Sequence, residues 1–148
     1  MNTSSTLATR LLRLPDKHGA LLAEFDWYAD FDLLHVRWHG HLTAESKIAG
    51  SRAGMSLFEA RRIPRRLLSD HSRVSGDWSE ALPWLHYEWL PAAVAGGLQA
   101  VAHIFSPDPA SNLPGRPGYA ELAAVFTRHM QAQAFRNFAP AWQWLTHR

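Results

Sequence analysis

The chain contains 148 residues, no cysteine and a formal net charge of +2. This length predicts a single domain around one core. The lack of cysteine excludes disulfides, thiolate metal ligands and cysteine nucleophiles, and it fits a reducing compartment. No uninterrupted apolar run approaches the ~20 residues that span a bilayer, and residues 1–6 lack the pattern of an export signal. We therefore expect a cytoplasmic protein without membrane insertion.

The densest basic run consists of Arg61, Arg62, Arg65 and Arg66, which flank Pro64. Nucleic-acid-binding proteins usually concentrate a basic excess on one face, whereas the net charge of this chain is small. A solvated helix end explains the run. We expect no nucleic-acid partner.

The first part of the chain is predicted to hold an arm and a hairpin. Residues 1–20 are expected to form an N-terminal arm, and residues 21–148 the folded domain. Strand-like runs over 21–28 and 33–39 are separated by a short polar segment. This arrangement predicts two antiparallel neighbours at the start of the sheet.

The middle of the chain is predicted to alternate helices and strands. A helix is expected over 43–63, because a proline follows that stretch. Residues 67–68 predict a short buried strand that stops at Asp70. A second helix is expected over 77–91, since its first residues match a capping box in which aspartate replaces serine or threonine.

The last third continues the alternation. A strand is expected over 98–105, and residues 106–118 form a loop because four prolines and two glycines fall within them. A helix over 119–130, a short edge strand over 134–138 and a final helix over 139–146 follow. The whole order predicts an α/β fold with a single mixed sheet of about five strands and helices mainly on one face.

Short apolar and aromatic motifs recur at the predicted element ends, and their order resembles that of the STAS-like (SpoIIAA-like) domains, in particular an uncharacterised bacterial branch. The resemblance covers residues 21–145. It rests on Trp38-x-Gly40-x-Leu42-Thr43, Leu67-Leu68-Ser69-Asp70, Trp84 through Trp89-Leu90-Pro91, Gly97-Leu98 with Ala100 and Ala102, and Ala141-Trp142-x-Trp144-Leu145. It implies the α/β architecture of that family and a non-enzymatic regulatory role.

The resemblance also points to one serine. In the anti-sigma factor antagonist branch, a serine within Asp-Ser-Ser-Gly at the start of the second helix is phosphorylated by a partner kinase. Ser79 is the residue of this chain that corresponds, which makes it the candidate phosphoacceptor. Its neighbours Trp78 and Glu80-Ala81 depart from the motif. The alternative is that Ser79 is an ordinary residue of a helix start.

Two clusters of polar residues are candidate sites of chemistry. His35, His39 and His41 lie in or after one predicted strand, but strand residues four apart are separated by roughly 13 Å, too far for two ligands of one metal ion. Asp70, His71, Ser72 and Ser75 together offer an acid, a base and hydroxyl groups within a few residues. A triad needs its members to converge from different elements, whereas adjacent residues point apart, which disfavours nucleophilic hydrolysis. We expect no metal, no cofactor and no enzymatic activity.

Aromatic residues give the remaining functional signal. Trp78, Trp84, Tyr87 and Trp89 lie within twelve residues, and Trp84 and Tyr87 fall outside the apolar stripe of the second helix. The candidate interaction or ligand surface combines these aromatics with polar residues at the predicted strand end: Asp70, Ser72, Asp77, Trp78, Trp84, Tyr87 and Trp89. The alternative is that the aromatics pack against the arm or the loop.

The sequence and the resemblance are compatible with two functions. The first is a protein-interaction or regulatory module that engages a protein partner or forms a homodimer, and it predicts an exposed aromatic patch without a sizeable cavity. The alternative is a small-molecule or lipid-binding carrier, as the resemblance to bacterial proteins described as lipid-binding-like implies, with an apolar pocket under the second helix and the 106–118 loop. The sequence does not separate them, because core and pocket aromatics use the same residue types.

Overall fold

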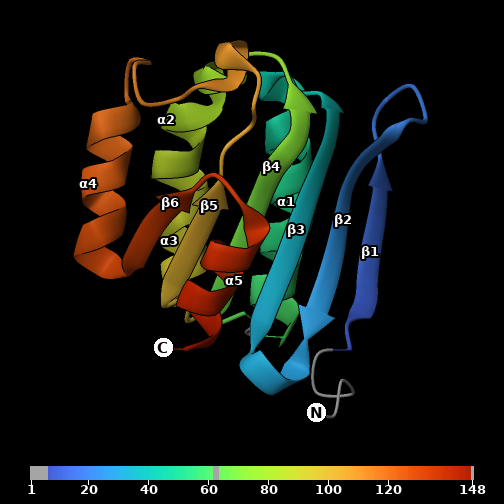
Figure 1. The fold of residues 1–148 in the computed structure, drawn as a ribbon, viewed down its shortest axis with the longest axis vertical. Coiled ribbons are helices and arrows are strands. Elements are labelled where there is room, and N and C mark those ends of the chain that lie inside the picture. Colours follow the sequence, from blue (N-terminus) through green and yellow to red (C-terminus); the bar gives the residue numbers. More distant parts are fainter. Residues whose placement is uncertain (1–6, 62–63, 148) are drawn as a thin grey trace.

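The fold is that of a computed structural model, which describes residues 7–61 and 64–147. Six strands form one sheet in the order of the chain (Figure 1). They are β1 Thr9–Pro15, β2 Leu21–Tyr28, β3 Leu33–His41, β4 Arg66–Ser75, β5 Ala100–Ile104 and β6 Gln131–Phe135. The pairs β1–β2 and β2–β3 are antiparallel, and β3–β4, β4–β5 and β5–β6 are parallel. The predicted α/β class with one mixed sheet is confirmed.

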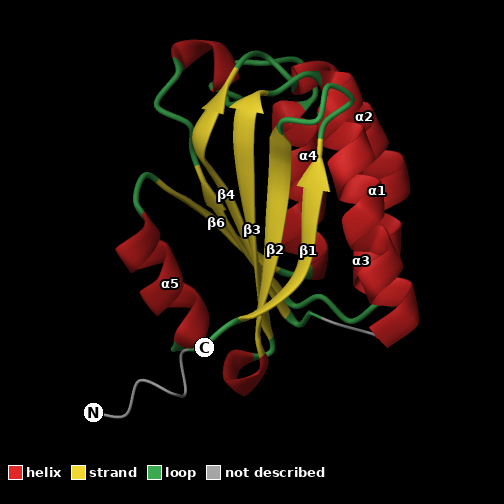
Figure 2. Cartoon of the chain, turned by 90° about the vertical axis from the view of Figure 1, so that its right-hand side faces the viewer, coloured by secondary structure: helices red, strands yellow, loops and turns green. Residues whose placement is uncertain are grey.

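The helices lie on both faces of the sheet, most of them on one. Their bounds are α1 Ala44–Arg61, α2 Leu82–Trp84, a π-helical turn η4 Leu85–Trp89, α3 Leu90–Ala95, α4 Tyr119–His129 and α5 Phe138–Thr146. Figure 2 shows α1 to α4 on one side of the sheet and α5 on the other. Each parallel strand pair is joined by a helical connection, which is what parallel neighbours require. The prediction of helices mainly on one face is confirmed.

Strand β1 lies within the stretch that the sequence predicts to be an arm. Thr9–Pro15 pairs with β2, and the Arg10 guanidinium contacts the Asp26 carboxylate on that strand. The expected number of about five strands is therefore one too low. Residues 1–6 of the predicted arm lie outside the described residues.

The sequence predicts that the strand at residues 67–68 stops at Asp70. In the structure, β4 continues to Ser75. It pairs with β3 beyond a register shift: Arg37 faces Asp70, His39 faces Arg73, and two residues of β4 lie opposite one of β3. This is a β-bulge, which changes the face on which the later residues of the strand lie. The prediction was wrong because the polar residues after Leu68 are typical of a strand end.

The second helical stretch contains a π-helical turn between α2 and α3. Pro91 follows this turn and lacks the N–H of a regular α-helix. The other predicted elements are confirmed with shifted ends. The helix expected over 43–63 is α1, with residues 62–63 outside the described part, and the edge strand β6 begins three residues before the predicted 134.

Candidate functional site

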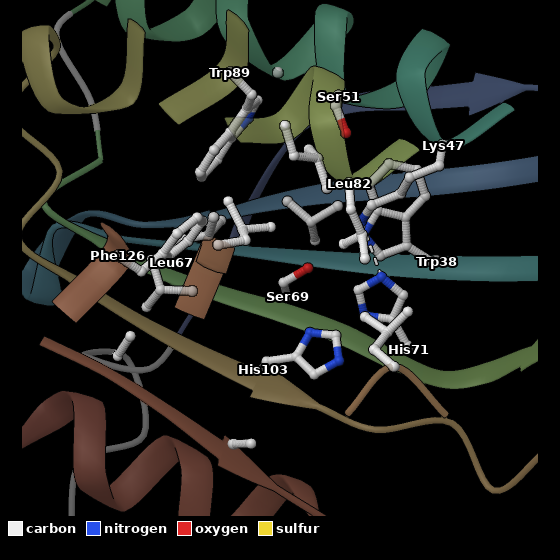
Figure 3. Close-up of a pocket in the computed structure, with 18 of the residues that line it drawn as sticks. Trp38, Lys47, Ser51, Leu67, Ser69, His71, Leu82, Trp89, His103 and Phe126 are labelled. Atoms are coloured by element: carbon white, nitrogen blue, oxygen red, sulfur yellow. Dashed lines mark hydrogen bonds between the residues drawn. The ribbon is translucent and has the colours of Figure 1, made fainter. Parts of the chain in front are cut away.

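A cavity of about 220 Å³ lies between the helix-covered face of the sheet and helices α1 to α4 (Figure 3). One water molecule needs roughly 10–15 Å³ on the same measure, so the cavity has room for a small organic molecule. Most of its lining is aliphatic or aromatic, including Phe25, Leu34, Val36, Phe58, Leu67, Leu82, Leu85, Trp89, Leu113, Leu122 and Phe126.

Two glycines of α1 form part of the cavity wall. Gly50 and Gly54 of this helix both line it. A Cβ at Gly50 would lie 2.5 Å from Cζ3 of Trp38, and a Cβ at Gly54 would lie 3.2 Å from Cε2 of Phe25. The two glycines therefore let large aromatic rings of β2 and β3 extend under the helix.

The cavity reaches the molecular surface between α4 and β6. Thr127, Gln133 and Ala134 belong to its lining, and all three residues are exposed. A molecule in the cavity is thus reachable from solvent along the β6 edge of the sheet.

One part of the lining is polar. Lys47 of α1, His71 of β4 and His103 of β5 contribute nitrogen atoms, and Ser69 contributes a hydroxyl group. Lys47 donates a hydrogen bond from Nζ to Nε2 of His71 across 2.9 Å. Both residues are buried, with 5% of Lys47 and 1% of His71 exposed. In Figure 3, Lys47, His71 and Trp38 lie toward one end of the pocket and Trp89, Phe126 and Leu67 toward the other.

Two indole rings surround this polar group. The imidazole of His71 stacks on Trp78, with centroids 5.0 Å apart and planes at 12°, and on Trp38, with centroids 5.8 Å apart and planes at 15°. Nζ of Lys47 lies 3.8 Å from the ring centroid of Trp38 and 4.6 Å from that of Trp78. Such cation–π contacts favour the charged lysine, but they supply no countercharge.

Burial controls the charge of the cluster. It lowers the pKa of Lys47 well below 10.5. Burial and then the nearby Lys47 lower the pKa of His71 well below 6.5, and the same two causes lower the pKa of His103 to about 3. At neutral pH the two imidazoles are uncharged, and the lysine gives up its proton more readily than a solvated one.

The alternation of side chains along β4 places two groups that are adjacent in sequence on opposite faces of the sheet. His71 lies on the cavity side, while Asp70 lies on the α5 side, where it accepts a hydrogen bond from Nε2 of His35 at 3.1 Å. Ser72 is exposed and donates from Oγ to the same carboxylate at 2.7 Å. Asp70 and Ser72 therefore do not share a surface with the aromatic residues of the cavity.

The predicted aromatic residues are divided between the cavity and the surface. Trp78 and Trp89 are buried and line the cavity. Trp84 is half-buried, with its ring 5.5 Å from the guanidinium carbon of Arg52. Tyr87 is 70% exposed and stacks on His86.

The acid and serine at the start of the second helical stretch lie near the surface. The Asp77 carboxylate accepts the backbone N–H of Ser79 at 2.9 Å and pairs with Arg116 at 3.4 Å. Ser79 is half-buried and begins the short 3₁₀ turn Ser79–Ala81. The carboxylate accepts a hydrogen bond from the first N–H of this turn, so it acts as a side-chain cap.

The histidines of β3 have separate partners. His35 contacts Asp70, His39 lies 2.8 Å from a carboxylate oxygen of Glu24, and His41 lies 3.2 Å from the hydroxyl of Ser75. Within residues 7–61 and 64–147, no three side chains of His, Asp or Glu are grouped so that they could hold a metal ion.

Sequence reasoning did not single out Lys47 or His103 and treated His71 only as part of a triad. A signal was present for Lys47. It is one of two lysines in the chain, and it occupies the same helical stripe as Gly50, Gly54 and Phe58. A lysine in the stripe that faces the core indicates either a buried ion pair or a ligand site.

Comparison with protein-family models, curated proteins and solved structures finds no match to this chain. Among the described helices, none is long and apolar enough to cross a membrane.

Proposed function

We propose that this protein binds a small, mainly apolar molecule in the cavity between the sheet and helices α1 to α4. The observation that carries the proposal is the cavity itself, with about 220 Å³ of space, an aromatic and aliphatic lining and a small polar cluster. Ligand sites typically combine a largely apolar wall with a few polar groups that orient the ligand.

The position of the cavity agrees with the carrier alternative derived from the sequence. Leu82, Leu85 and Trp89 of the second helical stretch line it, and Leu113 of the 106–118 loop closes one part. Side chains of a purely structural core would normally fill such a space, because protein interiors are packed without large voids. A void lined by rigid aromatic rings favours a ligand over a packing defect.

The distribution of polarity gives the ligand an orientation. The polar end lies at Lys47 and His71, and the apolar end lies near Trp89 and Phe126 (Figure 3). An amphipathic molecule with one polar end matches this distribution. A wholly apolar molecule would leave the buried polar groups without partners, which is costly.

Two substitutions on one helix test the proposal. Ala123→Phe places a ring in the cavity, whereas Ala124→Phe places the same ring on the exposed side of α4. We expect native mass spectrometry of the purified wild type to show a retained small molecule, or tryptophan fluorescence to report saturable binding of 1-octanol or octanoate. Ala123→Phe should abolish this binding and Ala124→Phe should retain it. Equal binding by both variants, or no binding by the wild type, would contradict the proposal.

The relationship to STAS-like domains is a further part of the proposal. An opening antiparallel pair followed by parallel strands with helical crossovers supports it, together with the motifs that carry the sequence resemblance. A cytoplasmic location, a protein partner or homodimer, and phosphorylation of Ser79 stay predictions. Tyr87 and Phe138 are the large aromatic residues exposed to a partner among the described residues.

A further inference from the structure

The polar end of the cavity contains a buried cationic side chain without an anionic partner. Nζ of Lys47 has one hydrogen-bond partner among the described residues, the imidazole of His71. No carboxylate of the described chain forms an ion pair with it, whereas the exposed Lys17 pairs with Glu45 at 3.3 Å. Buried lysines are ordinarily paired.

The lining explains why the protein itself does not supply the anion. It includes Lys47 but no Asp or Glu from the described part of the chain. The acid adjacent to His71 in sequence is Asp70, which lies on the other face of the sheet and is bound to His35. The cavity therefore ends at a buried amine, and the described residues of the lining supply no anion that could pair with its protonated form.

The uncharged polar groups at this end of the cavity are also suited to binding a hydrogen-bond acceptor. The indole N–H groups of Trp38 and Trp78 are buried and have no acceptor among the described atoms. Ser69 and the two imidazoles can each donate a hydrogen bond. Lysine and indole donors without a matching acceptor favour a ligand group that carries oxygen acceptors and negative charge.

We infer that the ligand bears a carboxylate that binds at Lys47 and His71, with its apolar body directed toward Trp89 and Phe126. This inference rests on the proposed ligand-binding function and names the ligand class as an amphipathic carboxylic acid. A single lysine beside neutral imidazoles balances one negative charge. A phosphate, with nearly two charges and three strong acceptor oxygens, would require further cations.

When a carboxylate binds beside Lys47, the protein takes up a proton. The groups that face Lys47 are His71 from β4 and His103 from β5, besides the indoles of Trp38 and Trp78, and none of them supplies a negative charge. Burial lowers the pKa of Lys47 in the free protein, and a bound carboxylate raises it again. The amine therefore gains a proton from solvent as the carboxylate binds, and no bond to the ligand is formed.

The test compares two ligands of equal chain length, octanoate and 1-octanol, by titration calorimetry in two buffers of different ionisation enthalpy. We expect octanoate to bind more tightly than 1-octanol and to take up a fraction of one proton at pH 8. Lys47→Met should weaken octanoate binding by roughly 10- to 100-fold, weaken 1-octanol binding much less, and abolish proton uptake. Lys17→Met is the matched control, since Lys17 is the other lysine of the chain and is exposed.

The outcomes separate this inference from the proposed function. If both ligands bind with equal affinity, or if Lys47→Met keeps the preference for octanoate, the carboxylate assignment is overturned and the binding function stands. If neither ligand binds to the wild type, both proposals fail. Thermal unfolding of Lys47→Met, together with its binding of 1-octanol, verifies that the variant is folded.

Discussion

Asp70 and His71 are consecutive in β4, yet their side chains interact on opposite faces of the sheet. Asp70 accepts a hydrogen bond from Nε2 of His35 at 3.1 Å on the α5 side, whereas Nε2 of His71 lies 2.9 Å from Nζ of Lys47 on the cavity side. The sheet thus separates an acid from a lysine that it could otherwise neutralise. The two faces give rise to different predictions.

Asp70→Asn should change how stability depends on pH. Burial raises the pKa of Asp70, but hydrogen bonds from His35 and Ser72 outweigh this effect and lower the pKa to about 2. A carboxyl group with a depressed pKa stabilises the fold above its unfolded pKa of about 3.9, and this stabilisation is lost as the pH falls toward 2. We expect Asp70→Asn to lose about 2 kcal/mol at pH 7 and much less near pH 2, as measured by urea unfolding.

Asp30→Asn is the control for this measurement, because Asp30 is exposed in the turn after β2. It should unfold like the wild type at every pH. A parallel loss of stability in wild type and Asp70→Asn between pH 4 and pH 2 would contradict the assigned role of Asp70.

Lys47→Met should stabilise the free protein at neutral pH. Methionine fills a similar volume without an amine to desolvate, so we expect a gain of about 1–3 kcal/mol at pH 7. Burial lowers the pKa of Lys47 well below 10.5, so the unfolded chain binds the proton more tightly. The contribution of Lys47 to stability therefore rises with pH, from its pKa in the folded protein up to about 10.5. The gain from Lys47→Met should shrink over the same range in denaturant titrations, and a gain that is constant with pH would contradict this account.

The two lysines of the chain should titrate separately. In protein labelled with ¹³C-lysine, we expect two ε-carbon signals in NMR spectra, one of which is lost in Lys47→Met. That signal should titrate well below 10.5 because Lys47 is buried. Octanoate should shift its midpoint to higher pH and leave the Lys17 signal unaffected. A Lys47 signal that titrates with the Lys17 signal would show that Lys47 is solvated.

Gly50→Ala should destabilise the fold despite the higher helix propensity of alanine. Its Cβ would lie 2.5 Å from Cζ3 and 2.7 Å from Cη2 of Trp38, so α1 or the indole must move. Propensity alone would stabilise α1 by about 1 kcal/mol, and overpacking typically costs about 1–3 kcal/mol. We expect a net loss in chemical unfolding. Gly54→Ala, whose Cβ would lie 3.2 Å from Phe25, should be affected less. The reverse order of stabilities would contradict this packing account.

Regular patterns predicted most of the fold. The hairpin of β2 and β3 was predicted because strand-like runs over 21–28 and 33–39 are separated by a short polar segment, and α4 was predicted because its apolar residues recur at helical spacing. These signals are local, so they are visible in one sequence. Strand β1 was missed because its stability comes from pairing with β2 and from contacts such as Arg10 with Asp26, which lie far apart in sequence.

Two residues of the predicted surface lie in the wall of the cavity. Trp78 and Trp89 belonged to the predicted surface and line the cavity, but the sequence could not distinguish a cavity wall from a packed core. Both use the same aromatic residues, and the difference is a volume that only the three-dimensional arrangement reveals. His103 had no local signal, because its role depends on the parallel alignment of β5 with β4.

The bulge in β4 accommodates one extra residue at positions 71–72 without moving core side chains to the wrong face. This residue lets His71 and Val74 both lie on the helix-covered side, although they are three positions apart. Deleting Ser72 would therefore remove the bulge and restore strict alternation, while His71 and Val74 kept the faces that they occupy. A deletion in the regular part of the strand, such as at Leu68, would instead reverse the facing of the side chains on one side of the gap.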